Sequence, residues 1–587
     1  MNKVVAIVEK DKCHPDKCNL ECIKYDPLNR SGGEGFHIGP SGKSEIAKEV
    51  VTDMHRISAK MCPFQAIKIA NLPKELNSEP LHMYGQNGFH LFFVPIPNFG
   101  KITGILGRNG IGKTTSIKIL AGLITPNLGR NEEATYEEIV KFFRGSEAQN
   151  YFEKLKDKKI TIAYKPQRID DIPKQYSGKV IDLLKKIDEM GILNSVTKEL
   201  NLKNILNNDL KNLSGGELQR IAIAATVMKK ANVLYFDEPS SYLDIKERIR
   251  IANYIKSLVN EETAIIVIEH DLLILDFITD VIHLMYGEPV VYGIASKPLA
   301  SKTGINSYLD GYLRTENIQF RQNKIHFGEK AIKIVGKQLI ASWPEMKKKL
   351  GNFNLDAKPG SIHNNEIVGI LGGNATGKTS FVKMLANVIK PDNCSIDLKL
   401  KVSYKPQYLE ADSDDLVETV LAKLEHEVDD YRNQILKHLD LEGLLLKKLN
   451  ELSGGELQRV AIALCLLKKA DLYLLDEPCA YLDVEQRLNV SKAIKEAVEL
   501  RGASAFVVDH DLLFLDYISD SLLVFEGEPS VNGKCSGPYN IKDGMNKLLK
   551  DLNITIRRDE DNKRPRINKP DSLKDREQKT KGEYFAS

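Results

Sequence analysis

The chain carries one ordered set of short motifs twice, and this internal repeat limits what it can fold into more than any other feature. The spacing is repeated too, since Asp237 follows Ser214 by 23 positions and Asp476 follows Ser453 by 23. The paired motifs are GRNGIGKTT at 107–115 and GGNATGKTS at 372–380, YKPQ at 164–167 and 404–407, LSGGELQR at 213–220 and 452–459, VLYFDEPSSYLD at 233–244 and LYLLDEPCAYLD at 472–483, and VIEHDLLILD at 267–276 and VVDHDLLFLD at 507–516. Each copy is far longer than the roughly 20–50 residues of a solenoid unit, so the sequence predicts a duplicated domain.

One spacing differs by far more than the others between the copies. Gln167 follows Lys113 by 54 positions, whereas Gln407 follows Lys378 by 29. The first copy therefore has about 25 extra residues, and their periodicity over 135–155 is helical with a break at Arg144-Gly145-Ser146. This pattern predicts a helix-turn-helix insert.

Each G-x-x-x-x-G-K-T follows an apolar run and precedes a helical pattern, which is the context of a phosphate-binding loop. We expect Lys113 and Lys378 to contact the β- and γ-phosphates of ATP, and Thr114 and Thr379 to hold Mg²⁺. The loop residues expected to bind the nucleotide are Gly107, Asn109, Gly110, Gly112, Lys113, Thr114, Thr115, Gly372, Asn374, Gly377, Lys378, Thr379 and Ser380. Ala375 stands where the first copy has Gly110, which predicts a modest asymmetry between two working sites.

The apolar runs that end in Asp237-Glu238 and Asp476-Glu477 predict buried strands that deliver carboxylates at their carboxyl ends. The first carboxylate of each pair suits Mg²⁺ and the second suits polarising the attacking water, so both copies should hydrolyse ATP. Solvated charges at strand ends are the alternative. Further candidates recur at matched positions: Gln167 and Gln407 for the metal and water, and His270 and His510 for the γ-phosphate.

Three aromatic residues precede the phosphate loops at distances suited to adenine stacking. They are Tyr84 and Phe89 before the first loop and Phe353 before the second. Ordinary core packing is the alternative interpretation.

The composition gives no sign of a membrane protein or of a uniformly basic surface. Lys and Arg number 83 and Asp and Glu 80, so the net charge of +3 supplies no general attraction to nucleic acid. No apolar run approaches the roughly 20 residues that cross a bilayer. We expect a cytoplasmic protein without a membrane partner. Eight cysteines in such a chain favour a metal or redox site over a disulfide scaffold.

Together the motifs resemble the Walker A, Q-loop, signature, Walker B, D-loop and switch-histidine elements of the ABC ATPase superfamily. The resemblance implies that each ATP lies between the phosphate loop of one cassette and the LSGGE signature of the other. Lys113 would then share a site with Ser453, Gly454 and Gly455, and Lys378 with Ser214, Gly215 and Gly216. A glycine pair permits close approach, and a helix N-terminus favours the phosphate charge.

Four cysteines near the start of the chain indicate which subfamily of ABC ATPases the sequence resembles. Cys13, Cys18, Cys22 and Cys62, the last followed by proline, resemble the pattern of bacterial-type ferredoxins. With the insert and the stretches at 304–321 and 544–569, nearly the whole chain resembles ABC subfamily E, the RNase L inhibitor family of ribosome recycling factors. The resemblance implies an ATPase that splits ribosomes after termination or rescue, with the small subunit, rRNA and a release or rescue factor as partners. A monomer is expected.

The cysteine pattern departs from that family, which has two clusters and eight cluster cysteines. Asp26, Thr52, His55 and Ser58 stand at the other four positions. Because the fourth cysteine of each run serves the other cluster, Cys13, Cys18, Cys22 and Cys62 form one complete set. We therefore expect one 4Fe-4S cluster and no second. A four-thiolate zinc site and no metal are the alternatives. We also expect Ile57, Met61 and Phe64 to fill the space of the missing cluster.

The predicted fold class is α/β, with two tandem ABC-type nucleotide-binding domains and a small N-terminal ferredoxin-like α+β domain. The predicted divisions are a degenerate iron–sulfur domain at 1–75, nucleotide-binding domain 1 at 76–300, a hinge at 301–325, nucleotide-binding domain 2 at 326–540, and a C-terminal hinge and tail at 541–587. Candidate rRNA phosphate contacts in the hinges are Arg314, Arg321, Arg557, Arg558, Arg564 and Arg566. The insert at 135–155 is a further candidate.

Three other functions remain open on the sequence. They are a translation factor of the ABC-F type, the ATPase subunit of an ABC transporter, and a scaffold that binds ATP without hydrolysing it. A transporter subunit would leave the cysteine domain and the insert without explanation. ABC-F proteins join their cassettes by a long charged helical linker, whereas the stretch between the copies here is short.

Overall fold

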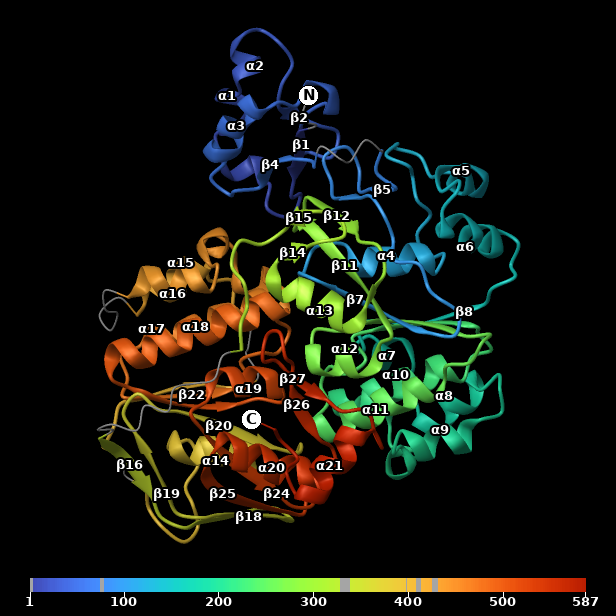
Figure 1. The fold of residues 1–587 in the computed structure, drawn as a ribbon. Helices are drawn as coiled ribbons and strands as arrows, with labels where there is room; N and C mark the ends of the chain where they lie inside the picture. Colours follow the sequence, from blue (N-terminus) through green and yellow to red (C-terminus); the bar gives the residue numbers. More distant parts are fainter. Residues whose placement is uncertain are drawn as a thin grey trace. The chain divides into compact units, whose positions relative to one another are not determined.

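The computed structural model describes residues 4–73, 79–327, 338–396, 399–407, 413–424 and 431–586. They fall into two compact units, each built around one large β-sheet (Figure 1). The first unit comprises Met1–Pro239, Tyr254–Glu269 and Thr279–Lys324, and the second comprises Ser240–Asn253, His270–Ile278 and Ile325–Ser587. In the part of the chain that is described, no helix is long and apolar enough to cross a membrane.

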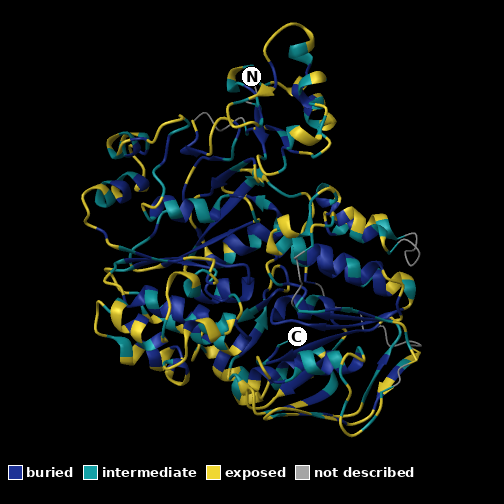
Figure 2. Cartoon of the chain, turned by 180° about the vertical axis from the view of Figure 1, so that it is seen from behind, coloured by how far each residue is buried: buried dark blue, intermediate teal, exposed yellow. Residues whose placement is uncertain are grey.

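The sheet of the first unit has nine strands, in the order β5-β6-β12-β11-β7-β10-β9-β8 with β13 beside β11. The bounds are β5 His82–Met83, β6 His90–Leu91, β7 Ile102–Gly107, β8 Ile162–Lys165, β9 Val233–Asp237, β10 Ala264–Ile268, β11 Val281–Glu288, β12 Tyr292–Ala295 and β13 Leu299–Ala300. Strands β8, β9, β10, β7 and β11 are parallel. Because β7, β9 and β10 are buried along their whole length, they are continuous apolar runs rather than alternating ones (Figure 2).

The helices of this repeat are α4 Lys113–Leu120, α5 Tyr136–Phe142, α6 Glu147–Lys156, α7 Ile172–Gln175, α8 Val180–Ile187, α9 Leu193–Glu199, α10 Gly215–Val227, α11 Ile245–Ser257, α12 Leu272–Ile278 and α13 Ser301–Asp310. Helices α5 and α6 lie in the insert. Their buried residues Tyr151 and Phe152 belong to the same core cluster as the strands, so the insert is part of the cassette core. Tyr151 donates its hydroxyl proton to the carbonyl of Leu120 at 2.7 Å.

The second unit repeats the plan with eight strands, in the order β17-β18-β25-β24-β20-β23-β22-β21. The bounds are β17 Met346–Leu350, β18 Phe353–Ala357, β20 Ile367–Gly372, β21 Val402–Lys405, β22 Leu472–Asp476, β23 Ser504–Val508, β24 Ser521–Glu526 and β25 Asn532–Asn540, with a separate pair of β16 Leu339–Trp343 and β19 Gly360–His363. The helices are α14 Lys378–Leu385, α15 Val417–Ala422, α16 Arg432–His438, α17 Gly454–Leu467, α18 Val484–Arg501 and α19 Leu512–Ile518. In both sheets, the strand before the phosphate loop (β7 or β20) and the strand that ends in the aspartate of the Asp-Glu pair (β9 or β22) are parallel, with one strand between them (β10 or β23).

The N-terminal domain is a small α+β structure, drawn in dark blue in Figure 1. Its strands are β1 Val4–Val8, β2 His37–Ile38, β3 Ser44–Glu45 and β4 Ile67–Asn71, and its helices are α1 Glu21–Lys24, α2 Pro27–Arg30 and α3 Arg56–Met61. Strands β1 and β4 pair antiparallel, with Val4 opposite Asn71 and Val8 opposite Ile67. The small core includes Phe36, Ile46 and Ala66 together with Cys13 and Cys22.

The remaining elements lie after each cassette. They are β14 Tyr312–Leu313, β15 Ile318–Gln319, α20 Ile541–Asp551, β26 Ile556–Arg558, β27 Pro565–Ile567 and α21 Leu573–Lys581. The predicted fold class is confirmed, with two cassettes of the same topology and a small α+β domain before them. The predicted domain boundaries stay predictions.

Candidate active sites and cysteine pocket

The two phosphate loops have the same geometry. Each runs from a buried strand, β7 or β20, into a helix whose N-cap glycine is left-handed, with φ +91° at Gly112 and +96° at Gly377. Lys113 Nζ donates to the carbonyls of Gly107 and Arg108, both at 2.8 Å. Lys378 Nζ donates to those of Gly372 at 2.9 Å and Gly373 at 2.6 Å. The loop carbonyls thus hold each lysine over its own loop.

Ala375 occupies a left-handed position in the second loop. Its φ is +56°, and that of its counterpart Gly110 is +73°. Both residues accept the same backbone bond, from Ser530 N at 3.1 Å and from Val290 N at 2.9 Å respectively. The loop therefore keeps its shape, and Ala375 carries the strain that a Cβ introduces there, on the order of 1 kcal/mol.

The first carboxylate of each Asp-Glu pair is buried beside the phosphate loop. Asp237 Oδ2 accepts from Thr114 Oγ1 at 3.0 Å. Asp476 is fully buried, and a hydrogen bond with Thr379 opposes the rise that burial gives its pKa. Burial raises the pKa of both aspartates to about 6. Buried carboxylate oxygens beside a threonine hydroxyl fit a hydrated Mg²⁺, which takes few protein ligands and keeps its waters.

The second carboxylate of each pair faces the Q-loop glutamine. Gln167 Nε2 donates to Glu238 Oε1 at 2.7 Å, and Gln407 Nε2 donates to Glu477 Oε1 at 2.8 Å. His510 Nε2 lies 3.6 Å from Glu477 Oε1, a charge contact longer than a hydrogen bond. Although burial raises the pKa of Glu477, the contributions of His510, Gln407 and Lys378 outweigh it and bring the pKa to about 2. This carboxylate is therefore ionised at neutral pH, as a group that polarises water must be.

His270 follows β10 in the chain, as His510 follows β23, and both are buried. In the signature motifs, Ser214 and Ser453 are the N-caps of α10 and α17, each in a capping box with the glutamate three residues on. Two helix N-termini are thereby presented by Ser-Gly-Gly turns, which is the geometry suited to an anion.

The three aromatic candidates lie against the phosphate loops. The rings of Phe89 and Phe353 lie so close to Gly112 and Gly377 that a Cβ at either glycine would lie 2.7 Å and 3.1 Å from them. Both rings also pack on the cassette cores. Tyr84 is 45% exposed, and its hydroxyl lies 3.3 Å from Thr115 Oγ1. Tyr84 therefore has the more accessible ring, and adenine stacking remains a prediction for all three.

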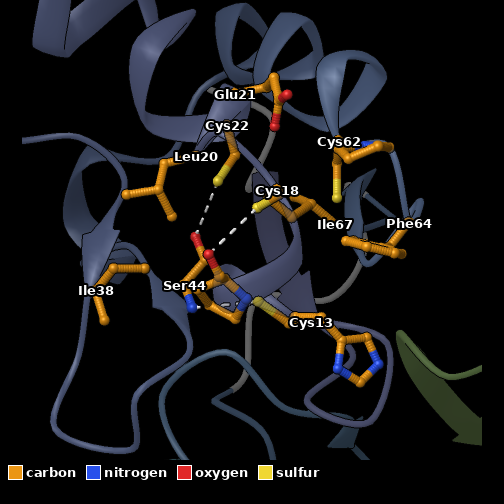
Figure 3. Close-up of a pocket in the computed structure, with 13 residues that line it drawn as sticks. Cys13, Cys18, Leu20, Glu21, Cys22, Ile38, Ser44, Cys62, Phe64 and Ile67 are labelled. Atoms are coloured by element: carbon orange, nitrogen blue, oxygen red, sulfur yellow. Dashed lines mark hydrogen bonds between the residues drawn. The ribbon is translucent and has the colours of Figure 1, made fainter.

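The four cysteines of the predicted cluster line one pocket in the N-terminal domain (Figure 3). The sulfur atoms of Cys13, Cys18, Cys22 and Cys62 face a common space in this view. Burial, and then the neighbouring thiols, raise the pKa of Cys22, while a hydrogen bond with Ser44 opposes that rise.

Backbone donors point at the sulfurs of this pocket. Ser44 N donates to Cys13 Sγ and Ala66 N to Cys62 Sγ, both at 3.4 Å. Ser44 Oγ lies 3.5 Å from Cys22 Sγ. Hydrogen bonds to sulfur stabilise the thiolates of a metal centre, so the residues present fit such a group.

The four positions without cysteine form a different structure, a buried polar cluster. Asp26, His55 and Ser58 are at most 1% exposed. Ser58 Oγ donates to Asp26 Oδ2 at 3.1 Å, and His55 Nε2 lies 3.7 Å from the same oxygen. His55 Nδ1 accepts from Thr52 N at 3.0 Å. Asp26 and Ser58 are hydrogen-bonded to each other with His55 packed beside them, and these side chains do not fit a second iron–sulfur cluster.

The prediction that apolar side chains fill this space is wrong for two of the three residues. Ile57 is 52% exposed and Met61 is 39% exposed. Phe64 packs on the domain core and lines the cysteine pocket. The expectation failed because the buried carboxylate of Asp26 needs hydrogen-bond donors around it rather than apolar side chains. One of these donors is Leu28 N, at 2.9 Å.

Several of the predicted rRNA contacts are bonded within the protein. Arg564 is fully buried, and its Nη1 lies 3.0 Å from Asp276 Oδ2. Arg566 bonds to Asp276 and Asp559, and Arg558 bonds to Asp516 through two nitrogens. Of the other three arginines, Arg557 bonds to Asn568 and Arg321 donates to backbone carbonyls. Arg314 is exposed. The prediction is therefore wrong for Arg564, whose guanidinium is inaccessible to a phosphate.

The sequence analysis did not single out four residues whose side chains contact the backbone of the two Asp-Glu pairs. Lys165 and Lys405 belong to the YKPQ motifs, and Gln219 and Gln458 to LSGGELQR. Their side chains reach the carbonyls of the Asp-Glu pairs. Their presence in both copies was the only signal of a role.

Two family models match the chain. The model described as ABC transporter matches residues 98–241 and 355–480. The model described as a possible Fer4-like domain in RNase L inhibitor matches residues 5–34, which include three of the four pocket cysteines.

Known proteins resemble the chain along its whole length. An ABC transporter ATP-binding protein of Methanocaldococcus jannaschii is 49% identical over 587 residues, covering 99% of this chain and 97% of that protein. A chain in a model of ribosome-bound archaeal Pelota and ABCE1 is 47% identical with a TM-score of 0.93, covering 100% of both chains. A chain in a complex of archaeal ribosomal stalk protein aP1 and archaeal ribosome recycling factor aABCE1 is 49% identical with a TM-score of 0.82, covering 86% of this chain and 99% of that one. This chain is an ATPase, and it belongs to the RNase L inhibitor family, subfamily E of the ABC ATPases.

Proposed function

We propose that this protein is an ATP-driven ribosome recycling factor that separates ribosomes into subunits after termination or rescue. The observation that carries the proposal is the full-length likeness, at a TM-score of 0.93, to a chain in a model of ribosome-bound archaeal Pelota and ABCE1. The proposed partners are the ribosome, mainly its small subunit and rRNA, and a release or rescue factor. The protein acts as a monomer in the cytoplasm.

ATP binding and hydrolysis drive the separation. Lys113 and Lys378 leave their loop carbonyls to contact the β- and γ-phosphates, and Glu238 and Glu477 polarise the attacking water. Gln167 and Gln407, already bonded to these glutamates, orient that water. Thr114 and Asp237 in the first site, and Thr379 and Asp476 in the second, would hold Mg²⁺, which would supply charge neutralisation at the phosphates. The resemblance implies that Ser453 completes the site of Lys113 and that Ser214 completes the site of Lys378, so ATP closes the cassettes and hydrolysis releases them.

The test is sedimentation of ribosomes on sucrose gradients with this protein, ATP and a release or rescue factor. Free subunits should appear with ATP. They should not appear with the Glu238→Gln, Glu477→Gln double variant or without nucleotide turnover. Intact ribosomes in every lane, despite active ATP hydrolysis, would refute the recycling function.

We also propose that the N-terminal domain holds one 4Fe-4S cluster, bound by Cys13, Cys18, Cys22 and Cys62. The support is chemical: four thiols line one pocket with backbone donors to two of the sulfurs, while Asp26 and Ser58 are hydrogen-bonded to each other beside the buried His55. Iron and sulfide should each be near four per chain.

Metal analysis separates the alternatives. Near eight iron atoms would refute a single cluster, one zinc atom would indicate a four-thiolate zinc site, and neither metal would indicate an empty domain. Cys18→Ser should remove the bound iron. Cys394→Ser, at a cysteine outside the pocket, is the matched control and should not.

A further inference from the structure

Each cassette buries a lysine side chain just before its Q-loop glutamine. Lys165 ends β8 and is fully buried, and Lys405 ends β21 and is 1% exposed. Gln167 and Gln407 follow two positions later. Within the described residues, neither lysine forms an ion pair shorter than 4 Å with a carboxylate. Each ammonium instead donates to backbone carbonyls.

Those carbonyls belong to the catalytic Asp-Glu pair. Lys165 Nζ lies 2.8 Å from the carbonyl oxygen of Asp237 and 3.2 Å from that of Glu238. Lys405 Nζ lies 2.8 Å from the carbonyl oxygen of Asp476 and 3.3 Å from that of Glu477. The lysine therefore contacts the Asp-Glu pair in the same way in both cassettes.

A second donor reaches the glutamate carbonyl from the signature helix. Gln219 Nε2 donates to the carbonyl of Glu238 at 2.6 Å, and Gln458 Nε2 donates to that of Glu477 at 2.6 Å. Three motifs of one cassette thus meet at one peptide group: the strand before the Q-loop, the signature helix and the Asp-Glu pair.

The peptide held in this way has a strained conformation. Glu238 has φ +50° and Glu477 has φ +49°, the left-handed region that is unfavourable for a residue with a Cβ. Such a conformation persists only where the surroundings determine it. Here it aims each glutamate carboxylate at the glutamine two residues beyond the lysine.

Burying an ammonium that no carboxylate contacts directly is itself unfavourable, even with the charges of the Asp-Glu pair nearby. An apolar side chain of similar length would fill the same space without that cost. The cost is nonetheless present at the same position in both cassettes, which favours a role in the reaction over one in packing.

We infer that Lys165 and Lys405 are positioning residues for ATP hydrolysis, each fixing the strained Asp-Glu turn through its carbonyls so that the glutamate faces the attacking water. The inference deepens the proposed function, since it rests on Glu238 and Glu477 polarising that water. In this role the lysines act through the glutamates, by way of the backbone carbonyls that they contact.

The test isolates one site at a time. In full-length protein carrying Glu477→Gln, turnover comes from the site of Glu238, and Lys165→Met is added. We expect kcat for ATP to fall about 10- to 100-fold, as for a misplaced catalytic group, with KM and nucleotide affinity changed less than about threefold. Lys405→Met in the Glu238→Gln protein should behave in the same way. An unchanged kcat, or a rise in KM equal to the loss, would overturn the inference.

Two further variants keep the test decisive. Lys495→Met removes a half-buried lysine that donates to the carbonyl of Tyr517 at 2.8 Å, away from the site, and should leave kcat unchanged. If Lys165→Met does not fold, Gln219→Leu removes the other donor to the Glu238 carbonyl and must lower kcat with KM unchanged. Turnover near the wild-type rate in the Glu238→Gln, Glu477→Gln protein would instead refute the catalytic role of the glutamates, so the two failures are distinguishable.

Discussion

The two cassettes have nearly the same hydrogen-bond geometry at their Asp-Glu pairs, and they differ in the structure around those pairs. The lysine-to-aspartate carbonyl distance is 2.8 Å in both, and the glutamine-to-glutamate distance is 2.7 Å in the first and 2.8 Å in the second. The phosphate loops differ at Gly110 and Ala375, and only the first cassette has the α5–α6 insert. The chain therefore repeats the geometry that hydrolysis needs and varies the parts that tune or support it.

The comparison predicts that the Asp-Glu pairs of both cassettes are catalytic. Changing Glu238 and Glu477 together to glutamine should lower ATP turnover about 1,000-fold, because neither site retains a group to polarise water. Each single variant should keep the turnover of the other site. Phosphate release measures both.

Glu496→Gln is the control for that experiment. Glu496 lies 2.8 Å from His438 Nε2, away from either phosphate loop, and its loss should leave turnover unchanged. If one single variant were as inactive as the double, the cassettes would not be equivalent in the sense that their geometry implies.

The insert gives a prediction that applies to the first cassette alone. Phe152 is 1% exposed within the first core, so Phe152→Ala should destabilise that cassette by about 3 kcal/mol through lost packing. Hydrogen exchange of amides in β7 and β9 should report the loss while those of β20 and β22 stay protected.

Tyr151→Phe is the matched small change in the same helix. It removes the hydroxyl that bonds to Leu120 and Tyr235, both at 2.7 Å, at an expected loss of about 1 kcal/mol. Equal protection of β7 in Phe152→Ala and wild type would mean that the insert is an appendage rather than core.

The smallest predicted effect comes from the phosphate loops. Gly110→Ala should destabilise the first loop by about 1 kcal/mol, because the alanine would adopt the left-handed conformation that Ala375 already has. A Cβ there would lie 3.4 Å from Val290, so strain rather than collision sets the effect.

Ala375→Gly should change the stability of its loop by less than about 1 kcal/mol, since relief of strain is offset by the freer unfolded chain. Hydrogen exchange of the loop amides measures both variants. A collapse of the first loop in Gly110→Ala would show that the two loops are not interchangeable.

Much of the site was predictable from the sequence because the motifs are local. A phosphate loop consists of consecutive residues, and β9 and β22 could be read as continuous apolar runs ending in Asp237 and Asp476. Internal duplication strengthened each assignment, since a second copy had to satisfy the same spacing.

The failures all involve partners that are distant in sequence. Arg564 bonds to Asp276, 288 positions away, and Asp26 bonds to Ser58, 32 positions away. No local pattern reveals that a charged side chain is buried, because periodicity reports which face is apolar and not what a polar group meets there. The role of Lys165 was not predicted for the same reason, although the repeated YKPQ motif contains this residue.

The most direct test of the account is a structure of the Glu238→Gln, Glu477→Gln protein with ATP and Mg²⁺. The account predicts two triphosphates, one contacting Lys113 and Ser453 and the other contacting Lys378 and Ser214. Triphosphates held only by their own phosphate loops, with both signature serines out of hydrogen-bonding reach, would contradict it.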